Sequence, residues 1–101
     1  MIGVSLHELR VLKDIFVPYQ TDFRFACYGS RAKGELEKTS DLDILICGKT
    51  VMPSEMLEEI KQKCDDSCLP YIVNFCDYHK IDPDFYKLIE KDLVFLNDKE
   101  N

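Results

Sequence analysis

Residues 28–44 read YGSRAKGELEKTSDLDI, and the fold can be worked out from this stretch toward both ends of the chain. Before it, residues 22–28 alternate between apolar and less apolar side chains, which predicts a strand that Gly29 ends. Residues 42–47 form a run that is apolar apart from Asp43, typical of a strand that is covered on both faces. The connection over residues 29–40 is too short for a crossover helix, so we expect the two strands to be antiparallel neighbours.

Three segments have the apolar spacing and the end signals of helices. Ser5 and Glu8 form a capping-box pattern at the start of the first segment, and Pro18 ends it. Pro53 opens the second, and Asp82 followed by a proline opens the third, with the aspartate as N-cap. The apolar faces of the three helices comprise Leu6, Leu9, Leu12, Ile15 and Phe16; Met56, Leu57, Ile60 and Cys64; and Phe85, Leu88 and Ile89.

Two more strands complete a mixed sheet. Pro70 precedes a strand over residues 71–76, and residues 93–96 form a short last strand or an extended tail. The antiparallel pair followed by alternating helices and strands places the chain in the α/β or α+β class. We predict a single domain over residues 1–101, in which a mixed β-sheet of about four strands has helices packed on it.

The composition is that of a folded, acidic chain. Of its 101 residues 46% are hydrophobic and 32% are charged, and the net charge is -6. These values exclude a disordered chain and a protein that binds nucleic acid in bulk through clustered Lys and Arg. A nucleotide substrate is compatible with them, because a divalent cation can bridge an acidic site to an acidic ligand.

Two sequence features bear on where the chain acts. No apolar stretch approaches the roughly 20 residues that span a bilayer. Residues 1–8 have neither the basic nor the apolar region of a signal peptide. We therefore expect a cytoplasmic chain without a membrane partner.

The five cysteines allow two interpretations. Their odd number, with three of them in apolar runs, predicts free thiols in a reducing compartment. The alternative is a zinc site that uses Cys64 and Cys68, which are four residues apart and would share a helix face. No second pair of cysteines accompanies them, and His7 and His79 lie far off in sequence, so the four ligands of a structural zinc site are not evident.

Gly29 and Ser30 have the properties of a phosphate cradle. They follow a strand, and we expect residues 30–34 to form one helical turn whose first N–H groups are unpaired. Glycine lets the backbone approach a ligand, serine adds a hydroxyl group, and Arg31 and Lys33 add positive charge. Taken alone, a Gly-Ser pair after a strand is usually only a turn, and two basic residues are usually surface charge.

Asp41 and Asp43 form the second half of the pattern. Residues two apart on a strand lie on one face, so we expect the two carboxylates a few ångströms apart. Leu42 and Ile44 then point the other way, into the core. Like charges this close repel unless a proton or a cation lies between them, and Mg²⁺ (or Mn²⁺) binds through carboxylates together with substrate phosphates. Alone, an Asp-x-Asp is more often a solvated strand end; with the cradle it predicts a metal-dependent nucleotide site.

The spacing of these residues resembles the signature of a known family. Gly-Ser, ten residues and then Asp-x-Asp is similar to the pattern of the DNA polymerase β-like nucleotidyltransferase superfamily. The forms GSRAKG and SDLD look like those of its minimal nucleotidyltransferases. The resemblance implies a nucleotidyltransferase-like fold and transfer of a nucleoside monophosphate, AMP from ATP, to an acceptor. The site residues that it implies are Asp41 and Asp43 for catalysis and the metal, and Gly29, Ser30, Arg31 and Lys33 for the nucleotide.

Position 74 departs from the family pattern. Family members carry a third metal-binding carboxylate on a later strand, and by position Asn74 stands in its place. Asp77 matches an aspartate that is not a ligand, and three residues along a strand it faces the opposite side. We interpret Asn74 as a degenerate metal-ligand position; the alternative is an asparagine that only satisfies hydrogen bonds in a strand. An amide carries no charge and cannot act as a base at neutral pH.

With asparagine at position 74, two functions are compatible with the sequence. The first is a Mg²⁺-dependent nucleotidyltransferase that uses ATP. The second is a catalytically weakened, nucleotide-binding or antitoxin-like subunit that binds a partner. Minimal nucleotidyltransferases resemble one half of two-protein toxin–antitoxin modules, so the resemblance also implies a helical HEPN-domain partner protein, whose tyrosine accepts AMP.

Overall fold

The computed structural model describes residues 3–29 and 41–97. The helical turn expected over residues 30–34 and the loop expected over residues 35–40 lie outside the described residues. The elements are, in chain order, α1 (Leu6–Phe16), a 3-10 turn (Val17–Tyr19), β1 (Phe23–Tyr28), β2 (Leu42–Gly48), α2 (Ser54–Asp65), β3 (Val73–Asp77), α3 (Pro83–Ile89), a second 3-10 turn (Glu90–Asp92) and β4 (Val94–Phe95).

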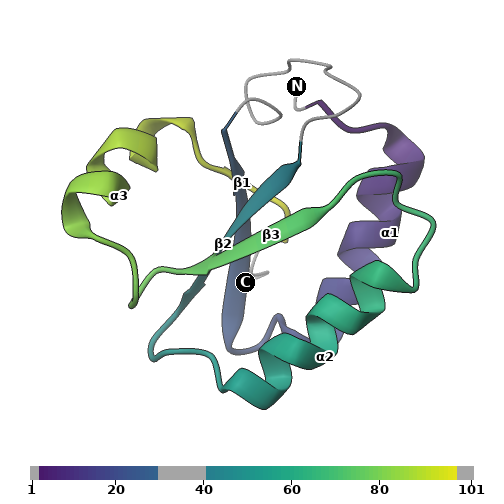
Figure 1. Cartoon of the computed structure of the whole chain (residues 1–101), viewed down its shortest axis with the longest axis horizontal. Coiled ribbons are helices and arrows are strands. Elements are labelled where there is room, and N and C mark those ends of the chain that lie inside the picture. Colours follow the sequence, from purple (N-terminus) through teal and green to yellow (C-terminus); the bar gives the residue numbers. More distant parts are fainter. Residues whose placement is uncertain (1–2, 30–40, 98–101) are drawn as a thin grey trace.

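The strands form one mixed sheet in the order β3-β2-β1-β4, which confirms the predicted fold class (Figure 1). β1 and β2 are antiparallel, as expected from their short connection. β2 and β3 are parallel, and β4 is antiparallel to the outer edge of β1. β3 begins at Val73 rather than at residue 71, because Val73 is the partner of Leu42, where the neighbouring strand β2 begins.

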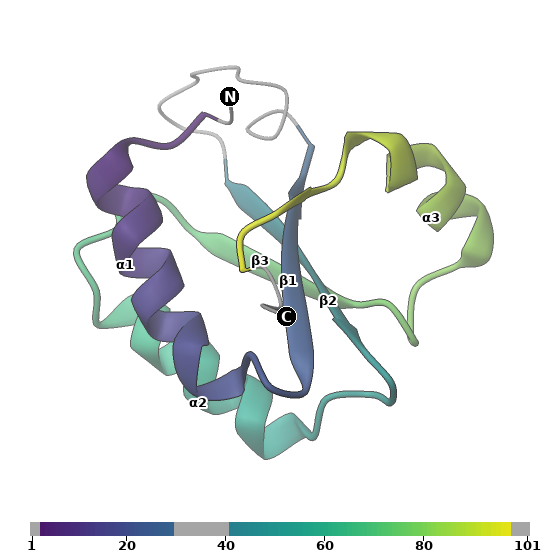
Figure 2. The same cartoon turned by 180° about the vertical axis from the view of Figure 1, so that it is seen from behind.

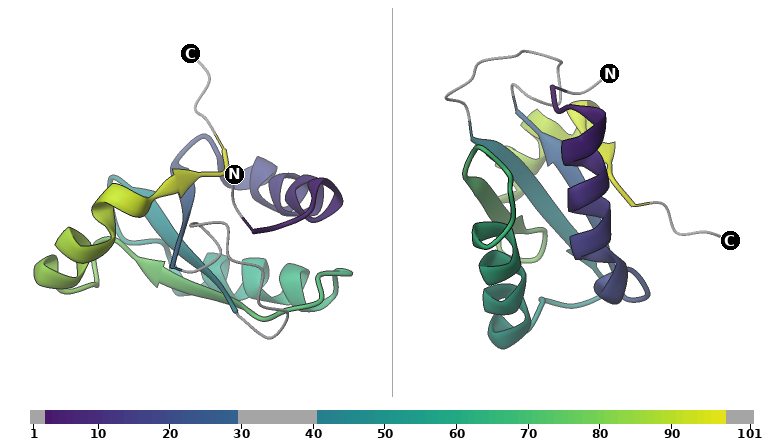
Figure 3. Two further views of the ribbon diagram at one scale, coloured as in Figure 1. Left: turned by 90° about the horizontal axis from the view of Figure 1, so that it is seen from above. Right: turned by 90° about the vertical axis from the view of Figure 1, so that its right-hand side faces the viewer.

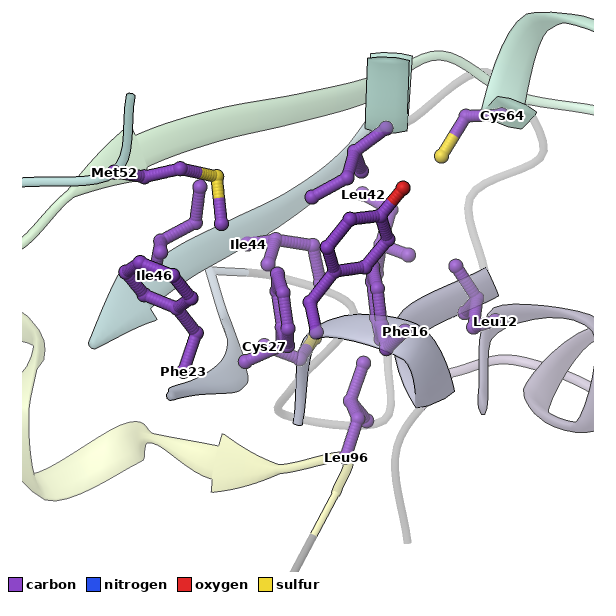
Figure 4. Close-up of a cluster of buried hydrophobic side chains, with 13 residues drawn as sticks. Leu12, Phe16, Phe23, Cys27, Leu42, Ile44, Ile46, Met52, Cys64 and Leu96 are labelled. Carbon is purple, nitrogen blue, oxygen red and sulfur yellow. The ribbon is translucent and has the colours of Figure 1, made fainter. Parts of the chain in front are cut away.

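Helices lie on both faces of the sheet. α1 and α2 lie side by side on one face, and α3 lies on the other (Figures 2 and 3). The main core fills the space between the sheet and the layer of α1 and α2, and the rings of Phe16 and Phe25 stack there with centroids 4.0 Å apart. Figure 4 shows much of this cluster, including Leu12, Phe16, Phe23, Cys27, Leu42, Ile44, Ile46, Met52, Cys64 and Leu96. Alternate residues of β1 and β2 therefore point into the core, as their periodicity predicts.

The helices begin where their sequence signals lie. The Ser5 hydroxyl accepts a hydrogen bond from the Glu8 N–H, and the Glu8 carboxylate accepts one from the Ser5 N–H, each at 3.1 Å. The Asp82 carboxylate caps α3 by accepting from the Asp84 N–H at 2.9 Å. None of the helices in the described part of the chain has the length and apolar character needed to cross a membrane.

The apolar stripe of α3 is only partly covered. The ring of Phe85 meets the ring of Tyr28 edge-on, with centroids 6.0 Å apart, which attaches α3 to the sheet. Leu88 on the same stripe is 71% exposed, and α3 contains no buried residue. The spacing of apolar residues identified the stripe, but it does not determine how much of it a neighbouring element covers.

None of the five cysteines, all of which lie in the described part of the chain, forms a disulfide bond, in agreement with the first interpretation. The expected shared helix face of Cys64 and Cys68 is wrong, because α2 ends at Asp65. Cys64 is buried in the core, whereas the exposed Cys68 has its Sγ atom 3.5 Å from His7 Nε2. Among the described residues no three His, Cys, Asp or Glu side chains are grouped so that they could hold a metal ion.

The segment that follows α3 closes the outer edge of β1. The Leu96 N–H donates to the Phe25 carbonyl at 2.8 Å. The side chain of Asn97, which is buried, accepts from the Phe25 N–H at 2.7 Å and donates to the Phe23 carbonyl at 3.1 Å. The amide of Asn97 thus continues the pairing of β4 beyond the point where backbone pairing stops.

Candidate active site

The acidic site lies on the face of the sheet opposite the main core. Asp43 is the second residue of β2, and its two neighbours in β2 point into that core. In the sheet register Asp43 is flanked by Tyr28 of β1 and Asn74 of β3. Strand periodicity places all three side chains on the same face. The central position of β2 therefore brings residues far apart in sequence to one place.

The amide of Asn74 joins the two predicted metal ligands. Its Nδ2 atom donates to Asp41 Oδ2 at 2.9 Å and to Asp43 Oδ1 at 3.3 Å. The structure therefore brings together Asp41, Asp43 and Asn74, which the sequence assigned to one site. Their roles in catalysis and metal binding stay predictions.

The geometry of these carboxylates fits a divalent cation. Both oxygens lie within hydrogen-bond distance of one nitrogen atom, so the two carboxylates line the same small acidic site. Carboxylates and phosphate oxygens are the ligands that Mg²⁺ prefers. A cation here would be held by Asp41 and Asp43, with the amide oxygen of Asn74 as the only other candidate among the three side chains.

Gly29 lies directly against Asp43. Its φ of +83° is in the left-handed region, where a residue with a side chain is strained. A Cβ atom at this position would lie 2.9 Å from Asp43 Oδ2. The backbone conformation therefore favours glycine, and a larger residue would in addition have to displace the end of the Asp43 side chain. Ser30, Arg31 and Lys33 lie outside the described residues, so their predicted roles in binding the nucleotide stay predictions.

Tyr28 lies beside Asp43 and packs against the surrounding elements, a role that the sequence analysis missed. Its hydroxyl donates to Cys76 Sγ at 3.2 Å, and its ring packs against Phe85 of α3. Burial raises the pKa of the Tyr28 hydroxyl well above its usual value, and the neighbouring Cys76 and Asp43 act in the same direction. The phenol therefore stays protonated and keeps donating. The expected antiparallel pairing of residues 22–28 with residues 42–47 could have placed Tyr28 here, because Tyr28 ends the first strand and Asp43 lies at the start of the second.

Asp77 is kept out of the acidic site, as its position along the strand predicts. It is buried, and its carboxylate accepts from the Met52 N–H at 2.8 Å and from the His79 N–H at 2.9 Å. These bonds fix the loop that enters α2 and the turn that follows β3. Asp77 is therefore a structural residue.

The fold and the site define the class of protein. The family described as "Polymerase beta, Nucleotidyltransferase" matches residues 12–100. The chain belongs to this family, and within it to the minimal nucleotidyltransferases that its motifs resemble. It is similar to a protein of Haemophilus influenzae named "Probable protein adenylyltransferase MntA", with 29% identity over 99 residues, which cover 98% of this chain and 87% of the relative.

Proposed function

We propose that the chain transfers AMP from ATP to a hydroxyl group of a partner protein, with Mg²⁺ or Mn²⁺ held by Asp41 and Asp43. One observation carries the proposal: two carboxylates converge on one atom, beside a glycine that lies against one of them. Such a pair suits a divalent cation that also binds phosphate oxygens. The name of the Haemophilus influenzae relative supports AMP as the transferred group and a protein as the acceptor.

In the proposed reaction the acceptor oxygen forms a bond to the α-phosphorus of ATP. The bond from that phosphorus to the oxygen bridging the β-phosphate breaks, and pyrophosphate leaves with this oxygen. The proton of the acceptor goes to solvent, because the amide of Asn74 cannot accept it at neutral pH. When bound, a divalent cation supplies neutralisation of the charge on the phosphates.

The proposal also assigns the groups that bind the triphosphate and the protein that carries the acceptor. Gly29 and Ser30 would contact the β- and γ-phosphates, and Arg31 and Lys33 would add positive charge beside them. The acceptor would belong to a helical HEPN-domain partner, as the family resemblance implies. These assignments extend the proposal beyond the described residues.

A second candidate function rests on Asn74. With an amide in place of a third carboxylate, the chain would be a catalytically weakened, antitoxin-like subunit that binds nucleotide and a partner. If the missing carboxylate acted as the base, its loss would reduce the rate by roughly 10²–10⁴. The hydrogen bonds from Asn74 to both aspartates favour this candidate, because the amide binds the two carboxylates but supplies no negative charge for a metal ion.

Transfer of label from α-labelled ATP with Mg²⁺ separates the two candidates. We expect the wild type to label the HEPN-domain partner from α-labelled but not from γ-labelled ATP, and the pair Asp41→Asn with Asp43→Asn to abolish labelling. Labelling only by Asn74→Asp would support the second function. If neither protein transfers label and neither binds ATP, both functions are wrong.

The cradle has its own test in Ser30→Ala. Loss of one hydrogen bond to a charged phosphate, worth roughly 1.5–3 kcal/mol, should weaken ATP binding about ten- to a hundred-fold without changing the melting temperature. If Ser30 only caps a helical turn, the variant should instead lose about 1 kcal/mol of stability and bind ATP as before. Measuring both quantities on one variant decides between these roles.

A further inference from the structure

We infer that the amide of Asn74 takes the place of a cation between Asp41 and Asp43, so that a divalent ion enters only together with the triphosphate. This inference rests on the proposed function and concerns how its site is filled. It starts from a geometric fact: one nitrogen atom donates to an oxygen of each aspartate, at 2.9 Å and 3.3 Å. An amide nitrogen has two hydrogens, so it can donate to both carboxylates at once.

The amide does for the carboxylates part of what a cation would do. Two like charges this close repel unless something between them offers positive charge. Hydrogen bonds to ionised groups are the strong ones among side-chain hydrogen bonds. Asn74 is therefore suited to hold the aspartates together in the absence of a metal, which an aspartate at the same position could not do because it would add a third negative charge.

The same contacts place the amide in competition with a free cation. An ion bound by both carboxylates must displace at least one of the two hydrogen bonds, and it gains no third charge in return. A triphosphate supplies the additional negative oxygens that this site lacks. The metal–triphosphate complex should therefore bind well, while the metal alone binds weakly.

Three proteins that differ only at position 74 test this order of binding. The side chain of Asn74 is exposed, and within residues 3–29 and 41–97 its side-chain hydrogen bonds are those to the two aspartates, so Asn74→Ala and Asn74→Asp are compatible with the fold. For Mn²⁺ alone, binding is measured as the loss of the electron paramagnetic resonance signal of the free ion. With the ATP analogue, which itself binds Mn²⁺, the ion retained by the protein is measured by equilibrium dialysis. Each protein is titrated with Mn²⁺ alone and with Mn²⁺ plus a non-hydrolysable ATP analogue.

The inference gives a specific ranking for Mn²⁺ alone. We expect Asn74→Asp to bind most tightly, Asn74→Ala next and the wild type least, with about ten-fold between Asn74→Ala and the wild type for one displaced hydrogen bond to a charged group. Adding the ATP analogue should strengthen Mn²⁺ binding to the wild type by a larger factor than it does for Asn74→Asp.

Two contrary results have different meanings. If the wild type binds Mn²⁺ alone more tightly than Asn74→Ala, the amide is a metal ligand rather than a substitute for one, and the inference is overturned while the proposed function stands. If no protein binds Mn²⁺ even with the ATP analogue, the proposed function itself fails. The pair Asp41→Asn with Asp43→Asn is the matched control and should bind Mn²⁺ in neither titration.

Discussion

Gly29→Ala is the most informative single substitution, because two separate features of the structure oppose it. The φ of +83° costs an alanine about 1–2 kcal/mol. The added Cβ would also lie 2.9 Å from Asp43 Oδ2. Moving that carboxylate away weakens its hydrogen bond to Asn74, which adds about 1 kcal/mol. We expect a total loss of about 2–3 kcal/mol, which corresponds to a fall in melting temperature of about 8–24 °C for a chain of this size.

A double-mutant cycle separates the two contributions. In an Asp43→Ala background the carboxylate is gone, so Gly29→Ala should cost only the backbone strain of about 1–2 kcal/mol. Gly48→Ala is the matched control, because its Cβ would lie 2.5 Å from the Phe23 ring at the other end of β2, with no involvement of Asp43. Its cost should be the same with and without the Asp43→Ala change. Urea unfolding followed by circular dichroism gives all of these free energies.

Two results would refute this reasoning. A total cost of Gly29→Ala below about 0.5 kcal/mol would mean that the backbone at this position does not need the left-handed conformation. A cost that is unchanged in the Asp43→Ala background would mean that the glycine does not lie against the carboxylate. Either result would remove the close approach on which the geometry of the acidic site depends.

Three further predictions concern stability. Burial raises the pKa of the Cys64 thiol from 9.0 to about 11. The unfolded chain therefore loses this proton at a lower pH than the folded chain, and the free energy of unfolding falls as the pH rises from about 9 to about 11. Between pH 8 and 10.5 the urea midpoint should fall less in Cys64→Ala than in the wild type. Asp77→Asn leaves a buried N–H without an acceptor and should cost about 1–3 kcal/mol in a thermal melt, with unchanged binding of metal and nucleotide. Asn97→Ala removes two buried hydrogen bonds to β1 and should cost about 1–3 kcal/mol by urea unfolding, whereas a neutral result would show that β4 alone holds this edge.

Capping patterns and apolar periodicity in the sequence predicted the features that depend on neighbouring residues. The Ser5–Glu8 capping box predicted the start of α1, and the two-residue period of a strand predicted that Asn74 and Asp77 lie on opposite faces of β3. These features depend on residues a few positions apart, so the sequence displays them directly. The family motif added the chemical class, which the periodicity of single elements does not contain.

Contacts between distant segments could not be predicted in the same way. The bond from Tyr28 to Cys76 and the two bonds of Asn97 to β1 depend on which strands become neighbours. The two hydrogen bonds of Asn74 depend in addition on side-chain orientation within the finished sheet. The exposure of Leu88 was not predicted for a related reason: an apolar stripe on a helix does not show which other element packs against it.

The closure of β1 by Asn97 has a consequence for synthesis of the chain. The bond from the Phe25 N–H to Asn97 joins residues 72 positions apart, so β1 emerges from the ribosome long before its outer neighbour exists. Until residues 94–97 have been made, that side of β1 has unpaired backbone groups, and open strand edges readily pair with other chains. A nascent chain stalled before residue 94 should therefore aggregate more readily than the released protein.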